Sequence, residues 1–194
     1  MKQRGDGVKG FVRDDLWFSL CGLNCGLCPM RLDQYCPGCG GGAGNQSCAI
    51  ARCGMEHGGV AYCFQCGSFP CGKYEGLDEY DSFTSHRNRR KDFETARKIG
   101  VDAYRDIQTR KAEILKLLLD QYNDGRKKRF FCFAVNLLEL EDLERALEQL
   151  LTRNVPEGET GRERAAYAAG LLQEAADRKS IDLKPRGKPR EKKR

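Results

Sequence analysis

The sequence predicts a mainly α-helical protein with little β structure, preceded by an irregular, cysteine-rich module that metal stabilises. Ten of the eleven cysteines lie between Cys21 and Cys71, far denser than in an ordinary domain. Twelve of the 54 residues from 19 to 72 are glycine, and no apolar pattern of period 2 or 3.6 is sustained there. After residue 89, apolar residues recur at helical spacing. The two halves therefore have different physical origins of stability.

Composition limits the classes of protein to consider. The 194 residues suffice for one ordinary domain or two small ones. Mean hydropathy is −0.65, 32% of residues are charged, and no apolar run approaches the roughly 20 residues of a membrane span. Residues 1–18 lack the apolar stretch of a secretory signal. We expect a cytoplasmic protein with no membrane partner.

The net charge of +6 is confined to the C-terminus. Residues 184–194 contain seven Lys or Arg and one Glu, which account for the whole of it, so the rest of the chain is formally neutral. The basic character thus indicates a tail rather than a nucleic-acid-binding face. Such a tail can make weak, non-specific, salt-sensitive contact with nucleic acid.

Shifts in composition predict five consecutive parts. They are an N-terminal extension at 1–18, a cysteine-rich metal-binding module at 19–75, an α-helical domain at 76–153, an additional C-terminal helix at 154–179 and a basic disordered tail at 180–194. Within the module we expect loops and single helical turns, because glycine interrupts every apolar stretch.

The helices are predicted from apolar spacing and from their end signals. Patterns typical of amphipathic helices cover 89–99, 102–124 and 142–153. The first has Phe93, Ala96 and Ile99 on one side and ends at Gly100. The apolar run at 130–140 is compatible with a buried helix or a strand. Thr160 and Glu163 have capping-box spacing for a helix at about 161–179.

Three C-x2-C pairs dominate the module: Cys25/Cys28, Cys36/Cys39 and Cys63/Cys66. Two intervening residues form a tight turn that directs both sulfurs to one point, which suits Zn²⁺ with Zn–S distances near ~2.3 Å. Glycine lies within two pairs (Gly26, Gly38) and after the third (Gly67), where we expect positive φ or close backbone approach. The candidate metal ligands are Cys21, Cys25, Cys28, Cys36, Cys39, Cys48, Cys53, Cys63, Cys66 and Cys71.

Zinc is the expected metal, in one to three ions and most simply two. Disulfides, the main alternative use of these cysteines, suit secreted chains rather than cytosolic ones. One division puts Cys25, Cys28, Cys36 and Cys39 at one site and Cys48, Cys53, Cys63 and Cys66 at the other. Interleaved sets, use of Cys21 or Cys71, and His57 as a replacement ligand remain open.

An iron–sulfur cluster is the alternative cofactor. Cys21-x3-Cys25-x2-Cys28 has the triplet spacing of radical enzymes that bind [4Fe–4S]. Those enzymes need a large α/β barrel, and the alternating strand and helix pattern of a barrel is missing here. A [4Fe–4S] cluster without radical chemistry, serving redox or electron transfer, stays open.

The strings CGLNCGLCP, CPGC, CAIARC and CFQCGSFPC resemble the bacterial and archaeal domain-of-unknown-function family 3795. All ten cysteines fit its pattern, including Phe69-Pro70 before the last of them. The resemblance continues through YDSFTSHRNRRKDFETARKIGVDAY and YNDGRKKRFFCFAVNLL to about residue 150. It implies a metal-binding protein and supplies neither a substrate nor a catalytic residue.

The function expected from these features is a binding or adaptor module with structural metal, and an iron–sulfur redox protein is the alternative. A third alternative is an enzyme with an open zinc position beside His57 or His86. The polar segment 82–90 around His86 is compatible with anion binding, although a solvated helix entrance explains it more simply. No hydrolase triad or phosphate-binding loop is present, so we expect no catalysis. The partner, which can be another protein, is not identified.

Overall fold

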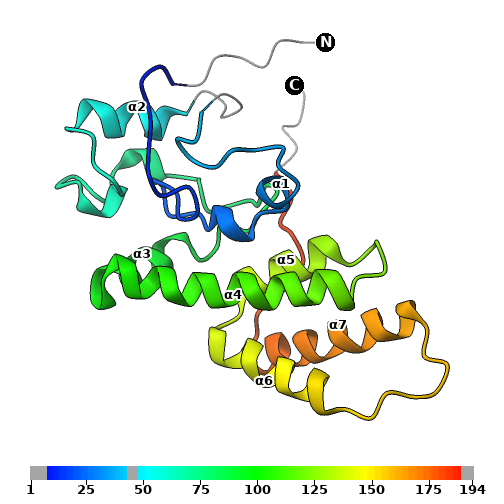
Figure 1. Ribbon diagram of the computed structural model, residues 1–194. Helices are drawn as coiled ribbons and strands as arrows, with labels where there is room; N and C mark the ends of the chain where they lie inside the picture. The colour runs from blue at the N-terminus through cyan, green and yellow to red at the C-terminus, as the bar shows by residue number, and fades with distance from the viewer. Residues whose placement is uncertain (1–7, 43–47, 189–194) are drawn as a thin grey trace, which may run out of the picture. The chain divides into compact units, whose positions relative to one another are not determined.

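The computed structural model describes residues 8–42 and 48–188 (Figure 1). In these ranges the chain is mostly helical, and β pairing is limited to an isolated bridge between Phe18 and Asn24. The prediction of a mainly α protein with little β structure is confirmed. No helix in the described ranges combines the length and the apolar character that crossing a membrane requires.

The elements follow one another in a simple order. Short turns and helices come first: η1 (Cys25–Leu27), α1 (Pro29–Leu32), α2 (Ala49–Glu56), η2 (Cys63–Gln65) and η3 (Gly72–Tyr74). The longer helices follow as α3 (Arg89–Ile99), α4 (Val101–Gln121), α5 (Lys128–Leu137), α6 (Leu140–Thr152) and α7 (Gly161–Arg178).

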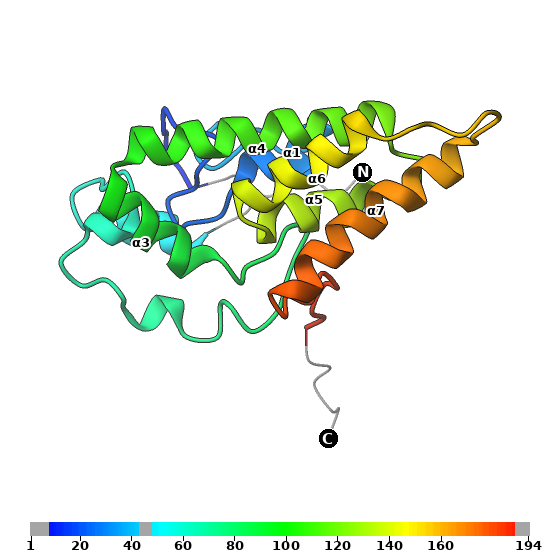
Figure 2. The same ribbon diagram turned by 90° about the horizontal axis from the view of Figure 1, so that it is seen from below.

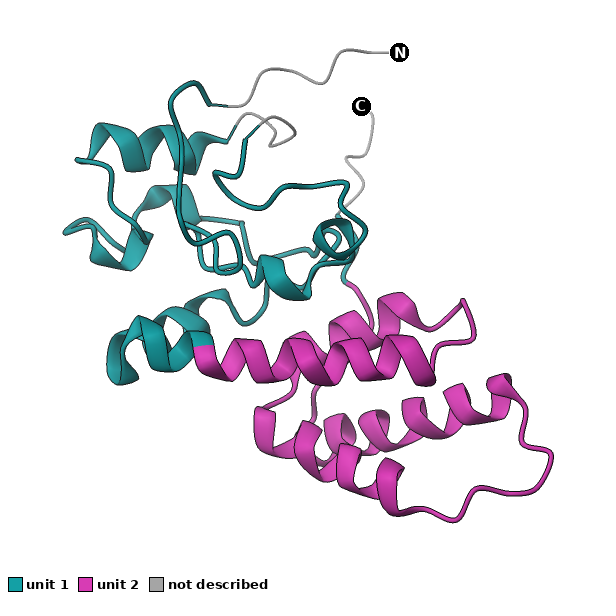
Figure 3. Cartoon of the chain, in the orientation of Figure 1, with its two compact units in different colours: residues 1–105, 186–194 teal, residues 106–185 magenta. Residues whose placement is uncertain are grey.

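The chain divides into two compact units (Figure 3). Unit 1 comprises the described residues up to Arg105 together with Arg186–Lys188, and unit 2 comprises Asp106–Pro185. The predicted boundaries at 75/76 and 153/154 therefore differ from the observed ones. Helix α3 and the first residues of α4 belong with the cysteines, and α7 is part of the helical unit rather than an addition to it.

Unit 2 is built from amphipathic helices. Its core side chains are almost all aliphatic or aromatic and are nearly inaccessible, as at Phe131, Leu143 and Leu172. Helices α6 and α7 lie side by side, joined by the loop at 153–160 (Figure 2). The apolar run at 130–140, which the sequence left as helix or strand, forms α5 and continues into the first residue of α6. The eleventh cysteine, Cys132, is 1% exposed within α5.

End signals act where the sequence predicts them. The Thr160 hydroxyl accepts from the Glu163 backbone N–H at 3.2 Å, and the Glu163 carboxylate accepts from the Thr160 backbone N–H at 2.9 Å. This capping box begins α7. Gly100, with φ of +91°, ends α3 in a conformation that favours glycine.

Unit 1 has an aromatic core to which distant segments contribute. The fully buried residues include Phe18, Tyr62, Tyr74, Phe93 and Tyr104. Phe18 lies within 4.8 Å of Tyr104 and 5.5 Å of Phe93, measured between ring centroids. Because Phe93 and Tyr104 come from α3 and α4, the cysteine-rich segment does not complete its hydrophobic core alone.

The beginning of the predicted tail is packed, contrary to the expectation of disorder from residue 180. Leu183 is only 4% exposed. The Asp81 carboxylate, which has no exposed side-chain surface, accepts from the Arg186 backbone N–H at 2.8 Å. The buried Leu183 side chain and the hydrogen bond from Arg186 to Asp81 thus order this segment, although the composition of residues 180–188 is polar. Residues 189–194 of the predicted tail lie outside the described ranges.

Candidate metal centre

All ten cysteines between Cys21 and Cys71 lie in unit 1. Each is partly buried, and each is a free thiol. The disulfide alternative considered for the sequence is therefore not realised among the described residues. The thiols gather around two cavities, one for each half of the cysteine-rich segment.

The first cavity has a free interior of about 230 Å³ and is lined by five thiols: Cys21, Cys25, Cys36, Cys39 and Cys48. Cys28 is next to this set, since its thiol interacts electrostatically with those of Cys25 and Cys36. Six cysteines from four separate stretches of chain thus share one region of unit 1.

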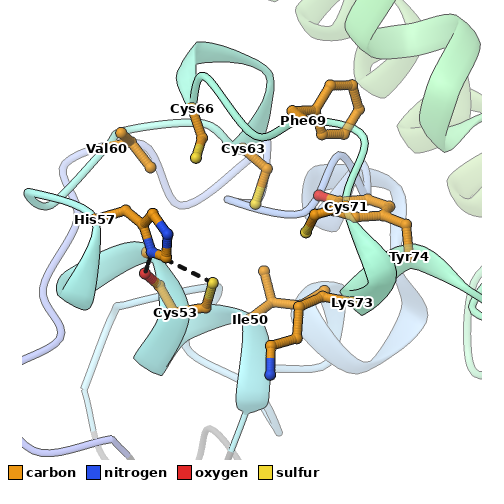
Figure 4. A pocket seen from close by; sticks show the side chains of 11 residues that line it. Ile50, Cys53, His57, Val60, Cys63, Cys66, Phe69, Cys71, Lys73 and Tyr74 are labelled. Atoms are coloured by element: carbon orange, nitrogen blue, oxygen red, sulfur yellow. Dashed lines mark hydrogen bonds between the residues drawn. The ribbon is translucent and has the colours of Figure 1, made fainter.

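The second cavity is lined by the other four thiols, those of Cys53, Cys63, Cys66 and Cys71 (Figure 4). Its free interior is about 20 Å³, close to the space that one water molecule needs. His57 also lines it, and its Nδ1 donates to the Cys53 carbonyl at 2.8 Å. That hydrogen bond leaves the lone pair of Nε2 available.

Helix α2 separates two cysteines that one predicted division places on the same ion. Cys48 is the N-cap of α2 and lines the first cavity, whereas Cys53 lies within α2 and lines the second. Five residues of helix rotate the side-chain direction by roughly 140° beyond a full turn. The observed grouping therefore puts Cys71, not Cys48, with Cys53, Cys63 and Cys66.

Two of the C-x2-C pairs form the same local structure. In η1 the Cys28 N–H donates to the Cys25 carbonyl at 3.1 Å, and in η2 the Cys66 N–H donates to the Cys63 carbonyl at 3.0 Å. Each pair is thus one turn of 3₁₀-helix, which brings its two thiols to one side of the turn. The expected tight turn is present at both positions.

Backbone N–H groups donate to several of the sulfurs. Burial raises the pKa of Cys28 and of Cys39, and the backbone N–H groups of Met30 and Arg31 (for Cys28) and of Leu20 (for Cys39) oppose that rise. Hydrogen bonds of this kind favour the thiolate form over the thiol. They are the surroundings that a metal-ligating sulfur needs, because the ligand must be deprotonated.

Without an ion the thiols themselves resist ionisation. Burial, and then the neighbouring thiols of Cys21, Cys39, Cys28 and Cys36, raise the pKa of Cys25 well above its usual range. Burial likewise raises the pKa of Cys63 to about 12, against the opposing effect of Tyr74. Crowded anionic sulfurs need a cation among them, which is the electrostatic requirement that a metal ion meets.

The side chain of Tyr74 lines the second cavity, although no sequence motif pointed to it. It is 2% exposed, and its hydroxyl has no hydrogen bond of normal geometry within the described residues. In Figure 4 the hydroxyl points toward the sulfurs of Cys63 and Cys71. Burial first, and then Cys63, raise the pKa of Tyr74 far above its usual range, so the hydroxyl keeps its proton.

Two polar side chains position the cysteine turns. Asn24, between Cys21 and Cys25, is 3% exposed and donates to the Asp92 carboxylate at 2.9 Å and to the Tyr104 hydroxyl at 3.0 Å. It fixes η1 against α3 and α4. Sequence reasoning missed it, although a polar residue within the CGLNC string was the available signal.

Arg13 is the second positioning residue, from the segment predicted as an extension. Its guanidinium donates to the carbonyl oxygens of Asp15, Phe18 and Ala61 at 2.9–3.0 Å. It therefore connects the chain before the first cysteine to the loop before η2. Residues 8–18 are part of unit 1 rather than a separate extension.

Both ring nitrogens of His86 make hydrogen bonds within the protein. It is 9% exposed, its Nδ1 donates to the Leu77 carbonyl at 3.0 Å, and its Nε2 accepts from the Ser82 hydroxyl at 2.9 Å. Both ring nitrogens are used, and burial lowers the pKa of His86, which keeps the ring neutral. The alternative of an open zinc position beside His86 is thus not favoured.

In the described residues, no three Cys, His, Asp or Glu side chains converge closely enough to hold an ion as they stand. The sulfurs line the cavity walls instead. Zinc and [4Fe–4S] as cofactors both stay predictions.

No protein-family model matches this chain, nor does any curated protein or solved structure. The resemblance of its cysteine strings to family 3795 stays a prediction.

Proposed function

We propose that this protein is a metal-binding, cysteine-rich binding or adaptor module in which Zn²⁺ has a structural role. Two ions fit the grouping of the thiols, one for each cavity of unit 1. The observation that carries the proposal is that nine free, partly buried thiols line two cavities of one compact unit and that a tenth, Cys28, lies beside the first of them.

The chemistry of the donors supports a thiophilic ion. Thiolate sets select Zn²⁺ or iron–sulfur clusters, whereas Mg²⁺ and Ca²⁺ prefer oxygen. Backbone donors to Cys28 and Cys39 favour thiolates, and the first and third C-x2-C turns have the shape of a two-sulfur chelate. Four sulfurs around an ion fill every tetrahedral position, which is typical of a structural site.

The size of the second cavity supports the same assignment. An interior of about 20 Å³ has room for an ion and not for an organic substrate, which usually needs ~300 Å³ or more. With the metal in a structural role, we propose that the protein acts through its surface, on a partner that can be another protein, rather than through catalysis. A cytoplasmic location, where thiols remain reduced, belongs to the same proposal.

An iron–sulfur redox or electron-transfer role is the second candidate, and one observation favours it. Cys21 is the thiol with the strongest electrostatic effect on Cys25, and Cys28 also interacts with Cys25. The three members of the Cys21-x3-Cys25-x2-Cys28 triplet are thus neighbours in space. A [4Fe–4S] cluster held by these three residues and one further thiol of the first cavity fits that arrangement.

Metal analysis after purification without oxygen tests the proposal. We expect a colourless protein with about two zinc ions per chain. A brown protein with iron and acid-labile sulfide supports the second candidate instead. A metal-free protein whose ten thiols all react with a thiol reagent contradicts both.

A pair of variants refines the same measurement. Cys66→Ser removes a thiol of the second cavity and should lower the zinc content by about one ion. Cys132→Ala removes the buried cysteine of α5 and should leave the content unchanged. Equal zinc content in both variants contradicts the assignment of Cys66 as a ligand.

A further inference from the structure

The hydroxyl of Tyr74 stands out among the buried polar groups of unit 1. The side chain is 98% buried, and the hydroxyl has no hydrogen bond of normal geometry in the described part of the chain. A buried hydroxyl without a partner costs about 1–3 kcal/mol. A phenylalanine in its place keeps the ring and avoids that cost, so the hydroxyl calls for a functional explanation.

The direction of the hydroxyl provides one. It points into the second cavity, toward the sulfurs of Cys63 and Cys71 (Figure 4). The ring is fixed by an edge-on contact with Phe69, with the ring centroids 5.0 Å apart. The backbone adds to this, because the Tyr74 N–H donates to the Cys71 carbonyl at 2.9 Å and forms η3. The hydroxyl is thus held beside the cavity before any ion is present.

A neutral thiol is a poor match for this hydroxyl. Thiols are weak hydrogen-bond acceptors, whereas a thiolate carries the negative charge that an O–H group prefers. A metal-bound cysteine is a thiolate, and the Tyr74 hydroxyl, which faces the Cys63 sulfur across the cavity, is placed to donate to it. Groups that donate to ligand atoms from outside the coordination sphere orient those ligands and strengthen binding.

We infer that the Tyr74 hydroxyl is a positioning donor to the thiolate of Cys63 when the second cavity holds a metal ion. The ion's ligands in that cavity are the thiolates of Cys53, Cys63, Cys66 and Cys71. The inference rests on the proposed function. It adds a specific hydrogen bond to one of the two centres and none to the other.

Tyr74→Phe removes only the hydroxyl and is the direct test. Tyr35→Phe is the matched control, since Tyr35 is 59% exposed and lines neither cavity. Both full-length variants and the wild type are loaded with Zn²⁺ and titrated with a chelator. In Tyr74→Phe we expect one of the two ions to leave at roughly 10-fold lower chelator concentration, with the other unchanged. Tyr35→Phe should match the wild type.

Co²⁺ in place of Zn²⁺ gives a readout that a packing defect does not produce. A hydrogen bond to a thiolate stabilises the sulfur lone pair, so its loss lowers the energy of the sulfur-to-cobalt charge-transfer band. We expect a shift of that band to longer wavelength in Tyr74→Phe and none in Tyr35→Phe. An unshifted band together with unchanged affinity for both ions overturns the inference, while the proposed function stands. A wild type that binds neither Zn²⁺ nor Co²⁺ overturns both.

Discussion

Unit 1 is larger than unit 2, and the two are stabilised in different ways. Unit 2 buries aliphatic side chains between amphipathic helices, with Leu143, Leu147 and Leu150 on one face of α6. Unit 1 has short turns, few helical residues before α3, and a core of aromatic rings next to partly buried thiols. Ordinary hydrophobic burial accounts for unit 2. In unit 1 several thiols, including those of Cys21, Cys39 and Cys63, pack partly buried against the aromatic core.

Core substitution in unit 2 should have the largest effect on stability. Leu143 has no exposed surface, so Leu143→Ala should lower the free energy of unfolding by about 2–5 kcal/mol. The zinc content should not change, because no candidate ligand lies in α6. Denaturant unfolding with metal analysis measures both quantities.

Leu151→Ala is the control in the same helix. Leu151 is 60% exposed, and its loss should change stability by no more than ~0.5 kcal/mol. If Leu143→Ala released metal, the two units would not differ in the way described here.

Glycine substitution in unit 1 sharpens the comparison at the turns. Gly38, inside the second C-x2-C pair, has φ of +94°, and a Cβ there would lie 2.6 Å from the Leu16 carbonyl oxygen. Gly38→Ala should therefore cost about 2 kcal/mol or more and loosen metal binding in the first cavity. Chemical denaturation and chelator titration measure the two effects.

Gly67→Ala is the matched control after the third pair. No atom lies within 4 Å of a Cβ at Gly67, so the substitution should be neutral to within ~0.5 kcal/mol. Equal losses at the two positions would show that the turn geometry does not distinguish them.

The smallest expected effect is local and depends on pH. Burial opposes ionisation of Asp81, but hydrogen bonds from the backbone N–H groups of Arg186 and His86 prevail and lower the pKa of Asp81 to about 2. Because the folded-state pKa of Asp81 is lowered, the stability contributed by its ionised carboxylate is fully present above the ordinary carboxyl pKa near 3.8. It is lost as the pH falls toward 2. The protection factor of the Arg186 amide, which compares its exchange rate with the intrinsic rate at the same pH, should fall over that range. In Asp81→Asn the protection factor should be lower at neutral pH and should change little with acid, and unchanged protection would contradict the role of Asp81.

The sequence predicts unit 2 more completely than unit 1 for a physical reason. Helix α7 and its capping box depend on residues three and four apart, so Thr160 and Glu163 suffice to locate its start. The same local reasoning places the end of α3 at Gly100. The prediction that Ile99 lies on the apolar side of α3 with Phe93 and Ala96 does not make it a core residue, because Ile99 is 41% exposed. Periodicity does not reveal which residues of an apolar stripe pack against another element.

In unit 1 the decisive relations are between residues distant in the sequence. Spacing identifies the C-x2-C turns but not that Cys71 shares a cavity with Cys53, since that depends on the direction of α2. Helix α2 itself was not predicted, because its eight residues are too few to display a sustained helical period. The expectation that the glycines at the C-x2-C pairs have positive φ or a close backbone neighbour is confirmed at Gly38. It is wrong at Gly67, which has neither.

Hydrogen exchange before and after exhaustive chelation under reducing conditions most directly tests the proposal that metal stabilises unit 1. The account predicts that the amides of η1 and η2 lose protection on metal removal and regain it when Zn²⁺ is restored. Amides of α6 and α7 should stay protected throughout. Undiminished protection of η1 and η2 in metal-free protein, with every thiol reduced and unligated, would contradict it.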